Sequence, residues 1–304
     1  MTATIAVTGG TGFVGAQLIE RALASGRQVR ALTRRDQPRR AGVIWVSGSL
    51  EDRESLVALT AGADAIVHIA GVISAPSRAG FEAGNATGTC NMLDAARAAG
   101  VRRFVHISSL AAREPALSDY GWSKSRSEAL VKDSGLDWTI IRPPAVYGPG
   151  DRETLDLFKM ARRGFVLLPP GGRFSVIEVG DLCRLILAAL GNCDAIAQTY
   201  EPDDGTKDGW EHRHFARLLG RAFGKRAKPL PMGGRVLATA SWLDRMARGD
   251  KAKLTADKVR YFLHPDWVVA AERRPPPALW SPTVRTPTGL KATADWYLEQ
   301  GWIR

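Results

Sequence analysis

The sequence is poor in cysteine and contains no long apolar run. Its three cysteines, Cys90, Cys183 and Cys193, are an odd number without CxxC spacing, which argues against a disulfide framework or a zinc site and fits a reducing compartment. No apolar stretch is long enough to span a bilayer. The first expected strand begins almost at once, which leaves no room for a signal peptide. We therefore expect a cytoplasmic protein without a metal site.

Acidic residues are too few to balance the basic ones. The 304 residues include 42 Lys and Arg against 31 Asp and Glu, a formal charge of +11. Between Gly205 and Arg274 there are 16 basic and 7 acidic residues, so most of the excess lies in this segment. A basic lobe can bind nucleic acid, an anionic substrate or an anionic membrane surface, or be simply solvated. No helix-turn-helix, zinc-finger or aromatic RNP pattern accompanies it, so we expect no nucleic-acid partner.

A glycine-rich turn stands near the start of the chain. The run Thr8-Gly9-Gly10-Thr11-Gly12-Phe13-Val14-Gly15 follows a short apolar segment and precedes a segment with helical spacing. Strand, glycine turn and helix in this order are typical of a dinucleotide site, and a plain strand-to-helix turn is the alternative. Gly9 would permit the tight turn, Gly12 would let the backbone approach a pyrophosphate, and Gly15 would let helix and strand pack closely.

The rest of the first half alternates between apolar strands and amphipathic helices. Strands are expected at residues 4–7, 29–33, 43–46, 65–70, 103–107 and 137–141, and helices at 16–23, 51–61, 85–99 and 120–132. This alternation predicts parallel βαβ units, that is, an α/β Rossmann fold with a doubly wound parallel sheet. Residues 1–150 would form the NAD(P)-binding domain, and residues 174–200, with a helix at 181–190, would return to it. Residues 151–173 and 201–304 would form a smaller, mostly helical substrate lobe.

The end of the second expected strand predicts which dinucleotide is bound. An NAD site usually places a carboxylate there, on the ribose 2′-hydroxyl. Here Thr33 is followed by Arg34 and Arg35, whose guanidinium groups suit a 2′-phosphate by charge and by bidentate geometry. We therefore favour NADP(H). NAD(H) is the alternative because Asp36 follows directly, and the whole segment could also be a solvated loop of charges.

A serine, a tyrosine and a lysine that follow the fifth expected strand predict a proton-transfer site. Ser109 comes just after the strand, Tyr120 follows 11 residues later, and Lys124 lies one helical turn beyond it. A phenol has a pKa near 10, and a neighbouring ammonium lowers that pKa. Tyr120 would then be the general acid for reduction of a ketone, Lys124 would tune it and hold the ribose, and Ser109 would hydrogen-bond the substrate oxygen. A surface tyrosine beside a lysine is the alternative interpretation.

Taken together, these motifs resemble the extended short-chain dehydrogenase/reductases, the epimerase/dehydratase-like branch of NAD(P)-dependent enzymes. The matching segments span the first half in the right order. They are Thr8–Gly15, His68-Ile69-Ala70-Gly71, Asn85-Ala86-Thr87-Gly88-Thr89, Val105-His106-Ile107-Ser108-Ser109, Tyr120–Lys124 and Arg142-Pro143-Pro144-Ala145-Val146-Tyr147-Gly148-Pro149-Gly150.

The resemblance implies an enzyme, and it implies that Ala70, Gly71 and Val72 line the cofactor, with Pro143 and Val146 beside the nicotinamide. The full set of expected cofactor contacts is Gly9, Thr11, Gly12, Phe13, Val14, Gly15, Arg34, Arg35, Leu50, Ala70, Gly71, Val72, Tyr120, Lys124, Pro143 and Val146. It also implies that Ser109 rather than Ser108 is catalytic, and that the protein is a monomer or a homodimer. Ser49 stands where the family often has an aspartate near the adenine, so that contact is in doubt.

The substrate is less well indicated than the reaction. The segment Arg173–Asp181 is more like that of family members acting on apolar alcohols and ketones than like that of nucleotide-sugar enzymes. The overall pattern is similar to bacterial reductases of the ceramide pathway, which are themselves similar to a nucleotide-binding accessory subunit of respiratory complex I. It implies reduction of a lipid-like ketone, such as a 3-oxo-ceramide in bacterial sphingolipid synthesis. A nucleotide-sugar epimerase or dehydratase and a non-catalytic NADPH-binding accessory protein are the alternatives.

One segment of the basic lobe has a separate pattern. Over residues 234–248 an apolar stripe has helical spacing, with arginines elsewhere on the helix. The stripe comprises Val236, Leu237, Ala240, Leu243 and Ala247, the arginines are Arg235, Arg245 and Arg248, and Lys251 and Lys253 extend the basic run. Such a helix can lie on an anionic membrane surface or pack its stripe on the core. Packing on the core is the preferred interpretation, and peripheral membrane contact is the alternative.

Overall fold

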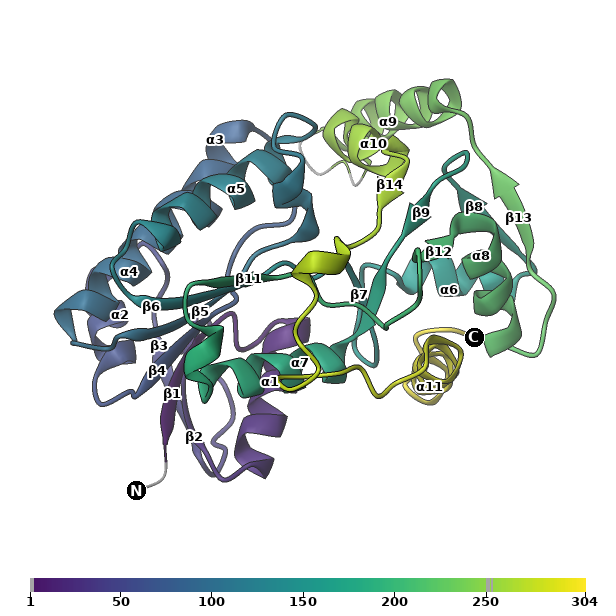
Figure 1. The fold of residues 1–304 in the computed structure, drawn as a ribbon. Coiled ribbons are helices and arrows are strands. Elements are labelled where there is room, and N and C mark those ends of the chain that lie inside the picture. Colours follow the sequence, from purple (N-terminus) through teal and green to yellow (C-terminus); the bar gives the residue numbers. More distant parts are fainter. Residues whose placement is uncertain (1–2, 250–251, 253) are drawn as a thin grey trace. The chain divides into compact units, whose positions relative to one another are not determined.

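The computed structural model describes residues 3–249, 252 and 254–304, so Lys251 and Lys253 lie outside the described residues. The chain divides into two compact units, each built from three segments (Figure 1). The first unit comprises Met1–Arg142, Leu182–Glu201 and Pro275–Trp280. The second unit comprises Pro143–Asp181, Pro202–Arg274 and Ser281–Arg304.

The first unit is organised around a parallel sheet with the strand order β11-β6-β5-β4-β1-β2-β3. Its strands are β1 (Thr4–Thr8), β2 (Gln28–Thr33), β3 (Val43–Ser47), β4 (Ala65–His68), β5 (Arg103–Ile107), β6 (Asp137–Ile141) and β11 (Gln198–Tyr200). Its helices are α1 (Phe13–Ala24), α2 (Arg53–Thr60), α3 (Arg78–Phe81), a π-helix (Glu82–Thr87), α4 (Gly88–Ala98), α5 (Asp119–Lys132), and two 3-10 turns (Leu110–Arg113, Cys193–Ala195); α7 (Val179–Leu190) begins in the second unit. The predicted doubly wound Rossmann sheet is confirmed.

The order of strands places the site. The sheet runs from β1 to β2 on one side and from β1 to β4 on the other, so the strand order reverses beside β1. In open α/β sheets, ligands bind outside the carboxyl ends of the strands at such a reversal. The central strands form because they are buried and almost wholly apolar on both faces: Ile5, Ala6 and Val7 of β1 are buried, as are the four residues of β4, whose one polar side chain, His68, is hydrogen-bonded.

Two predicted elements differ from the observed ones for local reasons. The strand predicted at 65–70 ends at His68, because the N–H groups of Ile69 and Ala70 donate to the Thr8 hydroxyl and thereby leave the sheet ladder. The helix predicted at 85–99 begins as an α-helix only at Gly88, since the π-helix precedes it. In contrast, β5 and β6 begin and end at the predicted residues.

The second unit combines helices with very short strands. The helices are α6 (Leu155–Arg162), α8 (His212–Ala222), α9 (Gly234–Arg248), α10 (Ala256–Leu263), α11 (Thr286–Glu299) and a 3-10 turn (Ala271–Arg273). The strands pair as β7 (Ala145–Tyr147) with β10 (Val176–Glu178), β8 (Phe165–Leu168) with β13 (Lys228–Pro231), and β9 (Arg173–Phe174) with both β12 (Trp210–Glu211) and β14 (Asp266–Trp267). Within the described ranges, no helix is both long and apolar enough to cross a membrane.

The stripe predicted on α9 is only partly buried. Leu237 is buried, but Val236 and Leu243 are each more than half exposed, so the preferred interpretation of a core-packed stripe is wrong for these two residues. Leu237 and Ser241 face the unit, and Val236 lies about 100° from Leu237 around the helix axis, so this edge of the stripe is turned toward solvent.

Candidate active site

The glycine turn joins β1 to α1 and needs glycine at two places. Gly9 has a φ of +73°, and a Cβ added there would lie 2.9 Å from the backbone nitrogen of Ala70. A Cβ on Gly15 would lie 2.1 Å from the carbonyl oxygen of Gly9. Any side chain at either position would force the turn apart.

The start of α1 is suited to a pyrophosphate. Gly12 is the N-cap, no side chain caps the helix, and its first turn contains no acidic residue. Thr11 and Gly12 are exposed, and Phe13 and Val14 are half-buried. Free N–H groups and the positive end of the helix dipole favour an anion there, and the bare Gly12 backbone lets it approach.

Buried hydrogen bonds fix the loop that follows β4. The Thr89 hydroxyl donates to the carbonyl oxygen of Asn85 (2.6 Å), so His68 Nε2 must carry the proton in its 3.0 Å bond to Thr89. His68 Nδ1 then accepts from the Thr8 hydroxyl at 2.8 Å. Burial, with a smaller contribution from the charge of Lys124, lowers the pKa of His68 to about 3, which keeps the ring neutral. Thr8 is therefore oriented to accept from the N–H groups of Ile69 and Ala70.

Asn85, on the π-helix, holds the next part of that loop. Its Oδ1 accepts from the N–H of Val72 (2.7 Å), and its Nδ2 donates to the carbonyl of Val72 (3.0 Å) and to Ser123 Oγ (2.8 Å). Ser123 in turn donates to the carbonyl of Tyr120. A Cβ on Gly71 would lie 2.6 Å from Asn85 Oδ1. The loop 70–72 and the first turn of α5 are thus connected through one amide.

Lys124 is buried in the first unit with its amine close to this loop. Its Nζ donates to the carbonyl oxygen of Ile107 at 2.8 Å, and a Cβ on Gly71 would lie 3.9 Å from Nζ. Burial lowers the pKa of Lys124 to about 8, although the Glu128 carboxylate acts in the opposite direction. The amine is therefore near its titration point close to neutral pH, as a group that exchanges protons requires.

Tyr120 lies one turn before Lys124 on α5 and is half-buried. Its ring lies against Phe81 of α3, with ring centroids 6.1 Å apart. The N-cap Ser118 accepts from the N–H of Gly121, which fixes the start of α5 next to Tyr120. Phe81 was not among the predicted site residues, since a single aromatic outside a recognised motif gives no signal.

The two serines after β5 have different environments. Ser108 is buried, and its hydroxyl donates to Glu128 (2.6 Å), whose carboxylate also pairs with Arg142 at 2.7 and 2.8 Å. Ser109 is half-buried, and its Oγ accepts from the N–H of Ala111. In this bond the Ser109 hydroxyl is the acceptor, so its proton can be donated to a ligand. The Ser108 hydroxyl proton is already donated to Glu128. This difference supports the predicted choice of Ser109.

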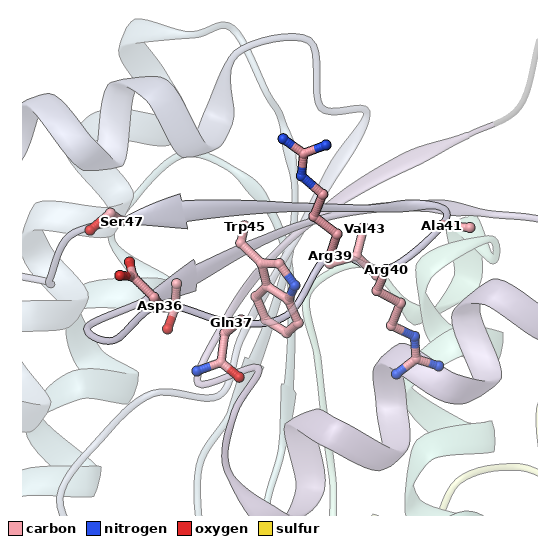
Figure 2. Close-up of a pocket in the computed structure, with 9 residues that line it drawn as sticks. Asp36, Gln37, Arg39, Arg40, Ala41, Val43, Trp45 and Ser47 are labelled. Atoms are coloured by element: carbon pink, nitrogen blue, oxygen red, sulfur yellow. The ribbon is translucent and has the colours of Figure 1, made fainter.

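At the carboxyl end of β2, Arg34 and Arg35 are exposed. Residues just before and after them in the sequence line a pocket of about 650 Å³ (Figure 2). It is lined by Thr33, Asp36, Gln37, Arg39, Arg40, Ala41, Val43, Trp45 and Ser47. In Figure 2 the Arg39 and Arg40 guanidinium groups point away from each other, and Arg40 pairs with Glu20 at 2.5 Å. Within the described ranges no side-chain partner is recorded for Arg34, Arg35 or Arg39, so these three cations are available to an anion.

Trp45 links this pocket to the glycine turn. A Cβ on Gly10 would lie 3.9 Å from the edge of its ring, and its indole N–H donates to the carbonyl of Pro38. Arg39 and Trp45 were not among the predicted site residues, because neither falls within a motif. The one signal for a larger anion site was the second arginine pair, Arg39 and Arg40, shortly after Arg34 and Arg35.

The remaining predicted contacts lie in two places. Leu50 is half-buried, and a Cβ on Gly88 of α4 would lie 2.7 Å from its Cδ1. Ser49 stands where the family often has an aspartate near the adenine. The nearby Asp52 does not take over that contact, because its carboxylate caps α2 by accepting from two backbone N–H groups. Pro143 and Val146 belong to the second unit, where Val146 pairs with β10, and their contact with a cofactor stays a prediction.

Similarity to known proteins points the same way as the geometry. Residues 9–166 match a family model described as NAD(P)H-binding. A ceramide reductase of Caulobacter vibrioides is 36% identical over an alignment that covers 98% of this chain and 96% of that one. A ketoreductase of Stigmatella aurantiaca that acts on a farnesylated dihydroquinoline oxide is 32% identical, over 60% of this chain and 63% of that one. The solved structure of UDP-N-acetylglucosamine 4-epimerase from Bacillus cereus has the same fold, with a TM-score of 0.74, 18% identity and coverage of 100% and 98%.

Proposed function

This chain belongs to the NAD(P)H-binding, extended short-chain dehydrogenase/reductase family, and from that premise we propose that it reduces a lipid-like ketone to an alcohol with NADPH. The observation that carries the proposal is the buried Lys124, held at the carbonyl of Ile107 one turn from Tyr120. A non-catalytic NADPH-binding protein could use this amine to hold the ribose, but it would not also need Tyr120 one turn away and Ser109 with a hydroxyl proton to donate.

The proposed chemistry divides between cofactor and chain. When bound, the nicotinamide supplies a hydride to the carbonyl carbon. Tyr120 donates its phenolic proton to the carbonyl oxygen, so that one C–H and one O–H bond form and the C=O double bond becomes single. Ser109 donates a hydrogen bond to the same oxygen and orients it. Lys124, protonated below about pH 8, favours the phenolate that remains, and Tyr120 is reprotonated from solvent.

The preference for NADPH rests on the cationic end of β2. Arg34, Arg35 and Arg39 are exposed guanidinium groups that pair with no carboxylate among the described residues, and a 2′-phosphate is the anion that this end of a dinucleotide would present. Thr33 has no carboxylate to offer a ribose hydroxyl, and its own hydroxyl proton is donated to the carbonyl of Arg35.

The lipid-like substrate is supported by the relatives. The ceramide reductase matches this chain over nearly its whole length, and the ketoreductase acts on a farnesylated ring. We therefore propose a 3-oxo-ceramide-type ketone, as in bacterial sphingolipid synthesis. The second candidate is a nucleotide-sugar epimerase, since a UDP-glucose 4-epimerase of Vibrio cholerae is 29% identical over 67% of this chain.

The reaction is tested by NADPH oxidation with a short-chain 3-oxo-ceramide as substrate. Tyr120→Phe removes the proton donor and leaves the ring, so we expect kcat to fall at least ~100-fold, which is the usual worth of a general acid. NADPH affinity should be unchanged within about threefold, because the phenol proton is used in the chemical step. Full activity in this variant would refute the assigned acid. Turnover of UDP-glucose with no response to the ketone would favour the epimerase.

The cofactor preference is tested separately by calorimetry with NADPH and NADH. Arg34→Ala should weaken NADPH binding about tenfold and leave NADH binding unchanged, because only NADPH carries the 2′-phosphate. Arg21→Ala is the matched control, since Arg21 is an exposed arginine in the last turn of α1. Equal affinities of the unmodified protein for both dinucleotides would remove the NADPH preference without affecting the proposed reaction.

A further inference from the structure

Helix α9 of the second unit exposes large apolar side chains. Val236 is 55% exposed, Trp242 60%, Leu243 54% and Met246 71%. At about 100° per residue these positions fall within a sector of about 120° around the helix axis, so they lie on one face of the helix. An isolated exposed leucine needs no explanation, but a face of four such residues on one helix marks an interaction site.

The opposite face of α9 shows that the helix is firmly seated. Leu237 and Ser241 are buried, and the mostly buried Asp244 carboxylate accepts from the N–H of Leu254 at 2.9 Å. Helix α10 packs beside α9, as Figure 1 shows, and its own Phe262 is 43% exposed. The apolar face of α9 therefore lies on the solvent side of a helix whose opposite side is covered.

The charges around this face are predominantly basic. The described residues between positions 234 and 263 include five Lys and Arg against two Asp. Arg235, Arg245 and Arg248 are exposed on α9. The acidic side chains of this pair of helices are engaged: Asp244 pairs with Arg248 (3.2 Å) and Asp257 with Arg260 (3.0 Å).

We propose that the α9–α10 surface, formed by the exposed Val236, Trp242, Leu243, Met246 and Phe262, docks this protein on an anionic lipid bilayer. Apolar and aromatic side chains with flanking arginines suit the boundary between headgroups and acyl chains, where the rings are buried and the cations meet lipid phosphates.

A second copy of this chain fits the surface less well. A two-fold contact would bring the same arginines of both copies together, and on α9 only Asp244, which already pairs with Arg248, could offset them. Anionic headgroups supply the missing negative charge. The proposal stands apart from the reductase function, since docking requires neither cofactor nor ketone, but it would bring the protein to the phase in which a lipid ketone is dissolved.

Vesicle co-flotation of the full chain, without NADPH or ketone, tests the proposal. The probes are vesicles of phosphatidylcholine mixed with phosphatidylglycerol, and vesicles of phosphatidylcholine alone. We expect binding to the anionic vesicles that weakens as salt is raised, and much weaker binding to the neutral ones. The double variant Trp242→Ser/Met246→Ser should lower the partition coefficient at least ~tenfold, because it removes two apolar anchors.

A matched control uses exposed apolar residues of the first unit. Ile44→Ser/Val57→Ser removes two side chains that are 54% and 58% exposed, and should leave vesicle binding unchanged. All the substituted side chains are exposed, and circular dichroism would verify that each variant is folded. No binding to anionic vesicles, or equal losses in both double variants, would overturn the proposal. A dimer in solution that Trp242→Ser/Met246→Ser dissociates, without vesicle binding, would assign the surface to a second copy instead.

Discussion

At the scale of single residues, Lys124 shows how the site uses a group that weakens the fold. Its side chain is 5% exposed, and burial is the main reason that its pKa falls from 10.5 to about 8. Below about pH 8 the folded chain therefore carries the cost of a buried charge. A residue retained at such a cost is usually retained for chemistry.

The pH dependence of stability follows from that pKa. Between about pH 8 and 10.5 the unfolded chain keeps the lysine proton while the folded chain loses it, so the stability contribution rises with pH across this window. Relative to Lys124→Met, which carries no charge, the unmodified protein should gain roughly 3 kcal/mol in free energy of unfolding from neutral pH to the upper end of the window. Urea unfolding without cofactor measures this difference. A difference independent of pH would show that Lys124 keeps its ordinary pKa.

The sequence could predict Ser109, Tyr120 and Lys124 because the chemistry requires those residue types at nearly fixed spacing. It could not predict that Ser108 is held by Glu128 and Arg142, since these partners lie on elements far apart in the chain. Phe81 was missed for the same reason: its contact with Tyr120 depends on how α3 packs, and a short helix leaves no periodic pattern.

At the scale of elements, the strands were more predictable than the segments between them. β5 and β6 were predicted with their observed bounds, because each is a short run between turns. The strands of the second unit are only two to four residues long, too short to show an alternating pattern, and were not predicted. On α9 the spacing gave a helix with the observed bounds, but spacing alone could not say which side of a broad apolar stripe is covered.

Asn85 gives an element-scale prediction, because one side chain joins the π-helix, the loop 70–72 and α5. Asn85→Leu removes three hydrogen bonds and leaves the Val72 amide unsatisfied, so we expect the free energy of unfolding to fall by about 2–3 kcal/mol. NADPH affinity should also fall about tenfold, since the loop predicted to line the cofactor loses its support. Asn85→Asp, which keeps the acceptor for Val72, should recover part of this affinity.

Thr293→Val is a control for the Asn85 variants. It removes a buried hydroxyl that donates to Gly289 within α11 of the second unit. It should lower stability without changing the calorimetric affinity for NADPH. An Asn85→Leu protein that binds NADPH normally would contradict the role assigned to the loop.

At the scale of the whole molecule, the chain builds its first unit from three separated segments. Arg142 ends the first segment and pairs both with Glu128 of α5 and with Glu201, which ends the second segment. Both carboxylates are at most 2% exposed. This cation therefore closes the sheet at the edge where β11 joins β6, and it also fixes Ser108 through Glu128.

Replacing Arg142 should destabilise the first unit strongly. Arg142→Met removes the nearest cation from two buried carboxylates and leaves Lys132, at 3.9 Å, beside Glu128; breaking a buried ion pair in this way costs about 3–5 kcal/mol. The triple variant Arg142→Met/Glu128→Gln/Glu201→Gln removes the charges as well and should recover a large part of the loss. Urea unfolding followed by fluorescence measures both. An Arg142→Met protein as stable as the unmodified chain would show that the network contributes no stability.

The π-helix at Glu82–Thr87 makes this segment one residue longer than a regular α-helix of the same number of turns would be. A π turn closes its hydrogen bond one residue later than an α turn, so this segment is an α-helix with one residue inserted. Deleting one residue there would restore a regular helix and rotate everything before it by about 100° relative to α4. Phe81 would then turn away from Tyr120, although every motif of the site would still be present in the sequence. In alignments of relatives, a single-residue gap at these positions would therefore indicate that the side chain packed against the proton donor Tyr120 has changed. It would do so more reliably than any substitution.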